Sequence, residues 1–166
     1  GAGLSTLADL ITGLREPASG AIELDAHDLR DLSLRRLRQA VVAVRSEGVF
    51  PGSIRDNVQV GRPAVELSVV RAALEAVGLW SEVADLPAGL ATPLAAGGWP
   101  LSPGDADRLL LARAIAGQPR LLVVDGLLDG LDAEARALAL DALFRPDAPW
   151  TLIVLSRHPD VLARCD

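Results

Sequence analysis

Residues Leu101–Asp132 read LSPGDADRLLLARAIAGQPRLLVVDGLLDGLD, and the layout of this stretch decides the fold. A long helical segment is followed by LLVVD at 121–125, a compact apolar run that suits a buried strand ending on an aspartate. A helical pattern covers 133–144, and TLIVL at 151–155 is a second apolar run. Apolar strands on either side of a helix indicate parallel strands joined by a crossover, so an α/β protein is expected.

The segments before this stretch extend the α/β pattern. Apolar residues at helical spacing predict a helix over 6–14, and AVVAV at 40–44 predicts another buried strand. Residues 53–117 are mostly helical in pattern, with Pro and Gly between 87 and 104 interrupting it. We therefore expect a single domain over residues 1–166, with a helical subdomain at roughly 53–117.

Composition limits the partners of the chain. All 16 basic side chains are arginines, and the net charge is -6. Because the chain lacks a basic stripe for phosphate backbones, nucleic acid is not an expected partner. The single cysteine, Cys165, cannot form an internal disulfide. Charges or prolines interrupt every apolar run, so the chain itself is not expected to cross a bilayer.

The first residues, GAGLST, look like the second half of a phosphate-binding loop of the form GxxGxGKST. Gly1 and Gly3 supply the backbone freedom that lets consecutive N–H groups converge on a phosphate. Ser5 stands at the position of a magnesium-binding hydroxyl, Thr6 follows it, and Leu4 replaces the lysine. The alternative is a glycine-rich start of a helix with no role in phosphate binding.

Several blocks, taken in order, resemble the nucleotide-binding domain of an ATP-binding cassette (ABC) exporter. Besides GAGLST and 101–132, they are EPASGAIELDAHDLRDLSLRRLR at 16–38, FPGSIRDNVQVGRP at 50–63 and GLATPLAAGG at 89–98. The resemblance covers essentially the whole chain. It implies a P-loop NTPase core with a parallel sheet and a helical subdomain, with the N-terminal strands and the start of the phosphate loop lying outside this sequence.

The same resemblance implies cofactors, partners and a location. Domains of this family bind ATP and Mg²⁺, pair head to tail with a second such domain, and couple closure of the pair to attached transmembrane helices. Such a domain lies at the cytoplasmic face of the cell membrane through its transmembrane domain. Ala96, before the signature, stands where exporters carry a glutamate, which puts that coupling in doubt.

Departures from the family pattern concern the chain's own nucleotide site. Leu4 removes the ammonium that lies against the phosphates, so weaker nucleotide binding is expected. Asp125 and Ser5 remain as Mg²⁺ residues, although Asp125 could instead cap a turn. Gly126 replaces the catalytic glutamate, and loss of a general base costs about 10²- to 10⁴-fold in rate. Near Arg45 the Q-loop glutamine is replaced, either by that cation or by the hydroxyl of the next residue.

The switch segment after the last strand is also altered. In LSRHPD the family's threonine and histidine align with Ser156 and Arg157. Arg157 could pair with a phosphate as a fixed cation but cannot relay a proton. His158 lies one residue further on, where an extended chain turns the side chain to the opposite side. His158 therefore also has a simpler interpretation as a solvated loop residue.

The signature motif serves the ATP of the partner domain. LSPGD keeps Ser102 and Gly104, whereas Pro103 removes a backbone donor and Asp105 places a carboxylate at the start of the following helix. That carboxylate suits the helix dipole but is expected to repel the partner's γ-phosphate. Asp132 keeps the D-loop carboxylate and also suits an N-cap of the next helix.

Taken together, these residues predict an ATP-binding domain of an exporter that binds ATP weakly and hydrolyses little, paired with a different, competent domain. Whether the domain is an enzyme is left open by the losses at Leu4, Gly126 and Arg157. One alternative is an active transport ATPase whose altered residues are compensated elsewhere. Another is a non-catalytic interaction module or a decaying gene copy that retains only the fold.

Overall fold

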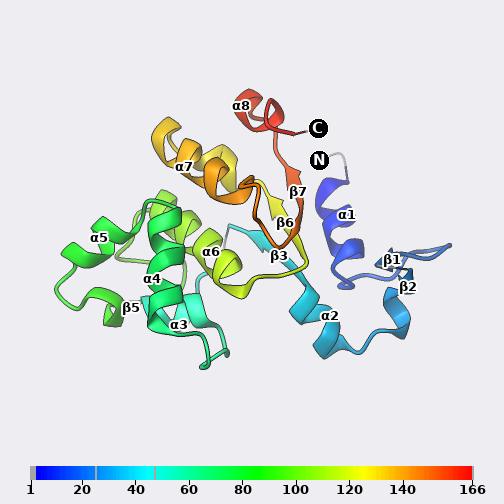
Figure 1. Ribbon diagram of the computed structural model, residues 1–166, viewed down its shortest axis with the longest axis horizontal. Coiled ribbons are helices and arrows are strands. Elements are labelled where there is room, and N and C mark those ends of the chain that lie inside the picture. Colours follow the sequence, from blue (N-terminus) through cyan, green and yellow to red (C-terminus); the bar gives the residue numbers. More distant parts are fainter. Residues whose placement is uncertain (1–2, 25, 47, 166) are drawn as a thin grey trace.

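The central sheet has three parallel strands in the order β3 (Val41–Arg45), β6 (Leu121–Asp125) and β7 (Thr151–Leu155). The structure is a computed structural model that describes residues 3–24, 26–46 and 48–165, with the backbone alone at Leu4 and Ser5 (Figure 1). The strands expected at 121–125 and 151–155 have the predicted bounds, and the expected parallel pairing is confirmed.

Side chains of β6 alternate between two apolar clusters, one on each face of the sheet. Leu121 and Val123 pack in the cluster that also contains Ala8 of α1 (Leu4–Ile11) and Leu37 of α2 (Leu34–Ala40). Residues 122 and 124 pack in the larger cluster with α6 (Pro103–Gly117) and α7 (Ala133–Leu143). Figure 1 shows α1 on one side of the sheet and α6 and α7 on the other. The expected α/β core is therefore a layered one.

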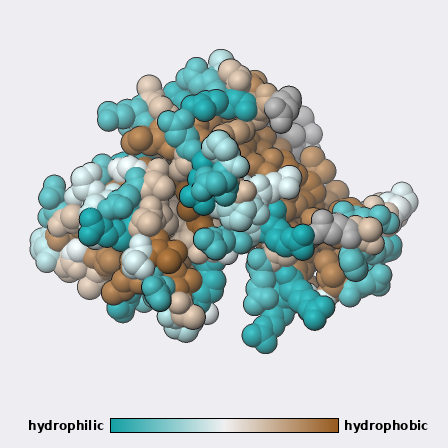
Figure 2. Space-filling model, viewed as in Figure 1, coloured by the Kyte–Doolittle hydropathy of each residue, from teal (hydrophilic) through white to brown (hydrophobic). Residues whose placement is uncertain are grey.

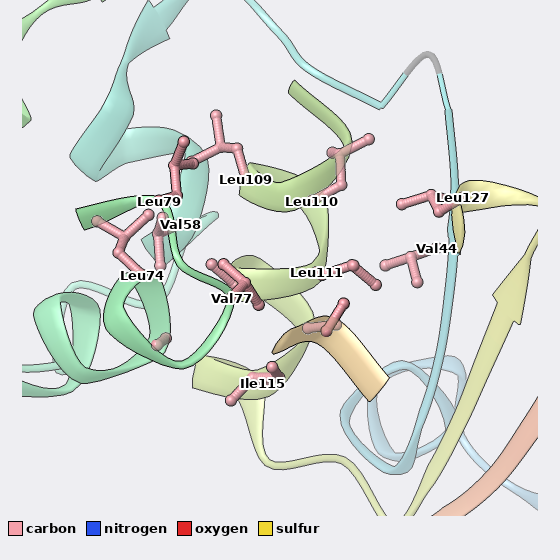
Figure 3. Packing of buried hydrophobic residues seen from close by; sticks show 14 of the residues in the cluster. Val44, Val58, Leu74, Val77, Leu79, Leu109, Leu110, Leu111, Ile115 and Leu127 are labelled. Atoms are coloured by element: carbon pink, nitrogen blue, oxygen red, sulfur yellow. The ribbon is translucent and has the colours of Figure 1, made fainter. Parts of the chain in front are cut away.

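The helices expected between 53 and 117 are present. α3 (Ile54–Gln59) and α4 (Leu67–Ala76) both pack against α6, and α5 (Trp80–Asp85) follows α4. Leu109 and Leu111 of α6 are fully buried, and Figure 3 shows Leu109 near Leu74, Val58 and Leu79. An antiparallel pair of two-residue strands, β4 (Gly52–Ser53) and β5 (Pro93–Leu94), was not expected from the sequence.

The remaining elements are short. They are β1 (Glu23–Leu24), β2 (His27–Asp28), η1 (Leu29–Asp31), η2 (Gly89–Ala91), η3 (Leu127–Gly130) and α8 (Pro159–Leu162). Figure 2 shows apolar surface gathered over the region of β7 and α1. None of the helices in the described ranges is both long and apolar enough to cross a bilayer.

Candidate functional site

The carboxyl ends of the parallel strands bring Arg45 and Asp125 together. The two residues are register partners at the ends of β3 and β6. Nε of Arg45 lies 3.1 Å from Oδ2 of Asp125, and Nη2 of Arg45 lies 2.7 Å from Oδ1 of Asp9 on α1. One guanidinium therefore joins the first helix to the sheet at the edge where α/β proteins bind ligands.

The charges at this edge are partly enclosed. The side chains of Arg45, Asp9 and Asp125 are 37%, 28% and 16% exposed. Hydrogen bonding to Asp9 is the main cause that raises the pKa of Arg45, and Asp125 raises it further. Arg45 is therefore held as a cation between two carboxylates, and the three groups together carry one net negative charge.

The residue after Arg45 faces a different partner. Ser46 hydrogen-bonds Asp107 of α6, and burial raises the pKa of Asp107. Of the two candidates for the Q-loop position, it is thus Arg45 that contacts Asp125. Asp107 was not singled out from the sequence, because only folding brings α6 beside the end of β3.

The residues at this edge do not fit a divalent cation as they are arranged. Mg²⁺ needs several oxygen ligands in a near-octahedral set. The Asp125 carboxylate is already hydrogen-bonded to Arg45, and the side chain of Ser5 lies outside what the structure describes. Within the described ranges, no three His, Cys, Asp or Glu side chains gather where they could hold a metal ion.

The amino end of α1 remains suited to an anion. Gly3 is the N-cap with φ of 73°, a conformation that glycine adopts without strain, and its carbonyl accepts the N–H of Leu7 at 2.9 Å. The first turn contains no acidic residue, so the helix dipole is not opposed there. Thr6 is exposed on this helix, whereas Gly1 and the side chains of Leu4 and Ser5 lie outside the described part of the chain.

The turn after β6 contains Gly126, the position at which the sequence predicts that a glutamate is replaced. Gly126 has φ of 76°, and its N–H donates to the carbonyl of Leu155 on β7 at 2.9 Å. A Cβ at this position would meet no atom within 4 Å, although the positive φ would strain any other residue there. The space next to Asp125 is therefore open at Gly126, and this residue supplies no group that could accept a proton there. Further along, Asp132 caps α7 by accepting the N–H of Ala135 at 2.9 Å.

The switch segment is held by Asp129 of η3. The hydroxyl of Ser156 donates to one oxygen of Asp129, and the N–H of Arg157 donates to the other at 3.2 Å. The Arg157 side chain itself is exposed. His158 caps α8, because its Nδ1 accepts the N–H of Asp160 at 3.3 Å. The imidazole is thus turned to a structural contact within its own loop.

The signature segment forms the start of α6. Ser102 is the N-cap and accepts the N–H of Asp105 at 3.2 Å, Pro103 is the first helical residue, and Gly104 follows it. The carboxylate of Asp105 pairs with Arg108. Asp105 is therefore held by a neighbouring cation at the amino end of the helix, which reduces the negative charge that it presents outward.

Comparisons with known proteins agree with this geometry. The ABC transporter family model matches residues 1–128. The chain is 32% identical, over its whole length, to ABC transporter B family member 1 of Arabidopsis thaliana, of which it covers 13%. Over 96% of its length it is 35% identical to the mycobactin import ATP-binding/permease protein of Mycolicibacterium thermoresistibile, of which it covers 29%.

A solved structure gives the same result. A bacterial Atm1-family ABC exporter with ATP bound matches 97% of this chain with a TM-score of 0.88 and 26% identity, and the chain covers 29% of that protein. The parallel sheet with a strand-end aspartate beside a glycine-led helix, together with this match, assigns the chain to the class of P-loop NTPase cores. The chain belongs to the ABC transporter family, in which its fold is that of the nucleotide-binding domain of an exporter. It spans less than a third of the length of these relatives.

Proposed function

We propose that this chain is a degenerate nucleotide-binding domain, which supports pairing and transport coupling but hydrolyses little or no ATP itself. The observation that carries the proposal is Gly126 directly after Asp125, with open space where a side chain would stand. Without a residue there to position water and accept its proton, the chemical step loses about 10²- to 10⁴-fold in rate.

Two further features support weak nucleotide binding. Leu4 stands at the lysine position, so the phosphate loop lacks its full positive charge. The Arg45 cation is shared between Asp9 and Asp125 and does not turn the net charge at the strand ends positive. A triphosphate at this edge would therefore rely on the backbone N–H groups of α1, starting at Gly3.

The partner in this proposal is a second ABC domain with an intact nucleotide site, and both domains are attached to transmembrane segments at the cytoplasmic face of the membrane. ATP and Mg²⁺ would then act mainly at the partner's own site. Ser102 and Gly104 at the start of α6 are the residues that would face a nucleotide held by the partner. The charge of Asp105 beside them is partly offset by Arg108.

The test compares ATP turnover by the purified protein with that of stepwise reversions. We expect wild-type turnover at background and little gain from Gly126→Glu alone. The combination L4K/R45Q/G126E/R157H should raise turnover by at least about 10²-fold, because the base then acts on a positioned substrate. Arg30→Gln, remote from the site, is the control and should leave turnover at background.

A clear wild-type turnover that Asp125→Asn abolishes would overturn the proposal in favour of a compensated ATPase. Pairing is measured separately, by mixing the protein with a competent ABC domain with and without ATP. If no nucleotide-dependent pairing is seen, the chain acts at most as a non-catalytic interaction module.

A further inference from the structure

The group that lies against Asp125 is the guanidinium of Arg45, a cation of the protein itself. Two nitrogens of the Arg45 guanidinium bind the carboxylates of Asp125 and Asp9, at 3.1 and 2.7 Å. These distances are those of charge-assisted hydrogen bonds, and both carboxylates lie within reach of one planar group. One oxygen of each carboxylate is therefore already bound to a side chain of the protein and not open to a metal ion.

Displacing that side chain would be costly. A divalent ion that enters would break both hydrogen bonds and leave the Arg45 cation beside it at the ends of β3 and β6. Like charges only a few ångströms apart repel strongly in a partly buried setting. The Arg45 side chain is 37% exposed and joins three elements, so swinging it away would break both ion pairs, which contribute to holding α1 beside the strand ends.

We infer that Arg45 takes the place of a divalent cation at the strand ends, so that this site excludes Mg²⁺. The guanidinium bridges two carboxylates, as a bound metal ion can, because it joins Asp9 of α1 to Asp125 of β6. If nucleotide binds here, which rests on the function proposed above, it binds as the metal-free anion. Exclusion of the metal itself does not depend on that proposal.

Removing the cation should create a metal site. In Arg45→Gln the carboxylates of Asp9 and Asp125 lose their shared partner and are left close together, a pair of oxygen ligands that suits Mg²⁺ or Mn²⁺. In Arg45→Lys the positive charge stays. The two variants thus separate the loss of charge from the loss of the arginine shape.

The experiment is a titration with Mn²⁺ in the absence of nucleotide, with free Mn²⁺ measured by electron paramagnetic resonance and folding checked by circular dichroism. We expect no site in the wild type or in R45K. R45Q should bind one Mn²⁺ at least about tenfold more tightly than the wild type, and R45Q/D125N should lose that site. Arg30→Gln frees the carboxylate of Asp28 at the surface and controls for unspecific binding.

Two results would overturn the inference. One is a Mn²⁺ site in the wild type that Asp125→Asn removes, and the other is an R45Q protein that folds but binds no more Mn²⁺ than R30Q does. A second titration, with ATP in EDTA or in Mg²⁺, tests the nucleotide. Weaker wild-type binding in Mg²⁺ than in EDTA supports metal-free binding, because Mg²⁺ ties up ATP as its complex, whereas equal or stronger binding in Mg²⁺ counts against the inference. If no ATP binds in either buffer, the proposed function loses its support while the Mn²⁺ result stands.

Discussion

Asp129 accepts a hydrogen bond from the hydroxyl of Ser156 with one oxygen and from the backbone N–H of Arg157, at 3.2 Å, with the other. This contact connects η3, which follows β6, to the segment that follows β7. The loops after β6 and β7 are therefore held together by this contact. The group that connects the two loops is the carboxylate of Asp129.

Asp129→Ala should loosen the segment after β7. Loss of two accepted hydrogen bonds at an exposed site is expected to cost about 0.5–1.5 kcal/mol and to speed exchange of the Arg157 amide hydrogen. Urea unfolding and hydrogen exchange measure these effects. Asp141→Ala, which removes an exposed ion pair with Arg164, is the control and should change stability by less than about 0.5 kcal/mol. Unchanged exchange at Arg157 would contradict the role given to Asp129.

Leu111→Ala should destabilise the whole domain. Leu111 is fully buried in the large cluster, and Figure 3 shows it between Val44 of β3 and Val77 after α4. A cavity at such a site costs about 2–5 kcal/mol. Leu67→Ala on α4 is the matched control, because Leu67 is 53% exposed, and its cost should stay near or below about 0.5 kcal/mol. Equal urea midpoints for the two variants would refute this packing.

Asp107→Asn should stabilise the protein more at neutral pH than at pH 3. Burial favours the protonated acid and raises the pKa of Asp107 above its ordinary 3.8, so the folded chain holds that proton more tightly than the unfolded chain does. Stability from this group therefore falls as pH rises through the window above 3.8. Urea midpoints of wild type and variant between pH 3 and 7 measure the difference, which should grow with pH.

The ionisation of Asp28 is expected to change stability with pH in the opposite direction to that of Asp107. Hydrogen bonding from the Arg30 side chain lowers the pKa of Asp28 from 3.8 to about 2. The ionised acid thus favours the folded state above pH 3.8, and this contribution is lost as pH falls toward 2. Asp28→Asn should lower the urea midpoint at pH 6 and have less effect near pH 2. Parallel pH profiles for D28N and D107N would contradict at least one of the two assignments, and the direction of the shared trend would show which.

The pattern of apolar residues predicted the main strands and helices, because each buried element is a contiguous segment with a recognisable spacing of apolar side chains. The runs at 121–125 and 151–155 are strands with the expected bounds, and the helix expected from 133 is α7. The pair β4 and β5 was not predicted, since two-residue strands are too short to show an alternating pattern. The order of the segments and the spacing of apolar side chains were sufficient to predict the core, but not to predict short elements such as β4 and β5.

The contacts at the site could not be read from the sequence in the same way. Arg45 is separated from Asp9 by 36 residues and from Asp125 by 80, and no local pattern connects the three. The resemblance to the family pointed to Asp125 and to the altered position near Arg45. The direction in which the guanidinium points depends on the register between β3 and β6, which the sequence does not show. Asp107 was overlooked for the same reason.

The alternation along β6 has a consequence for how such a chain changes over generations. Residues 121–124 point into one apolar cluster or the other, whereas Asp125 and Gly126 lie past the end of both. The requirement to fold therefore constrains residues 121–124, whereas the chemistry of the site depends on Asp125 and Gly126. A substitution at Asp125 or Gly126 can therefore alter the chemistry of the strand end while both apolar clusters stay intact.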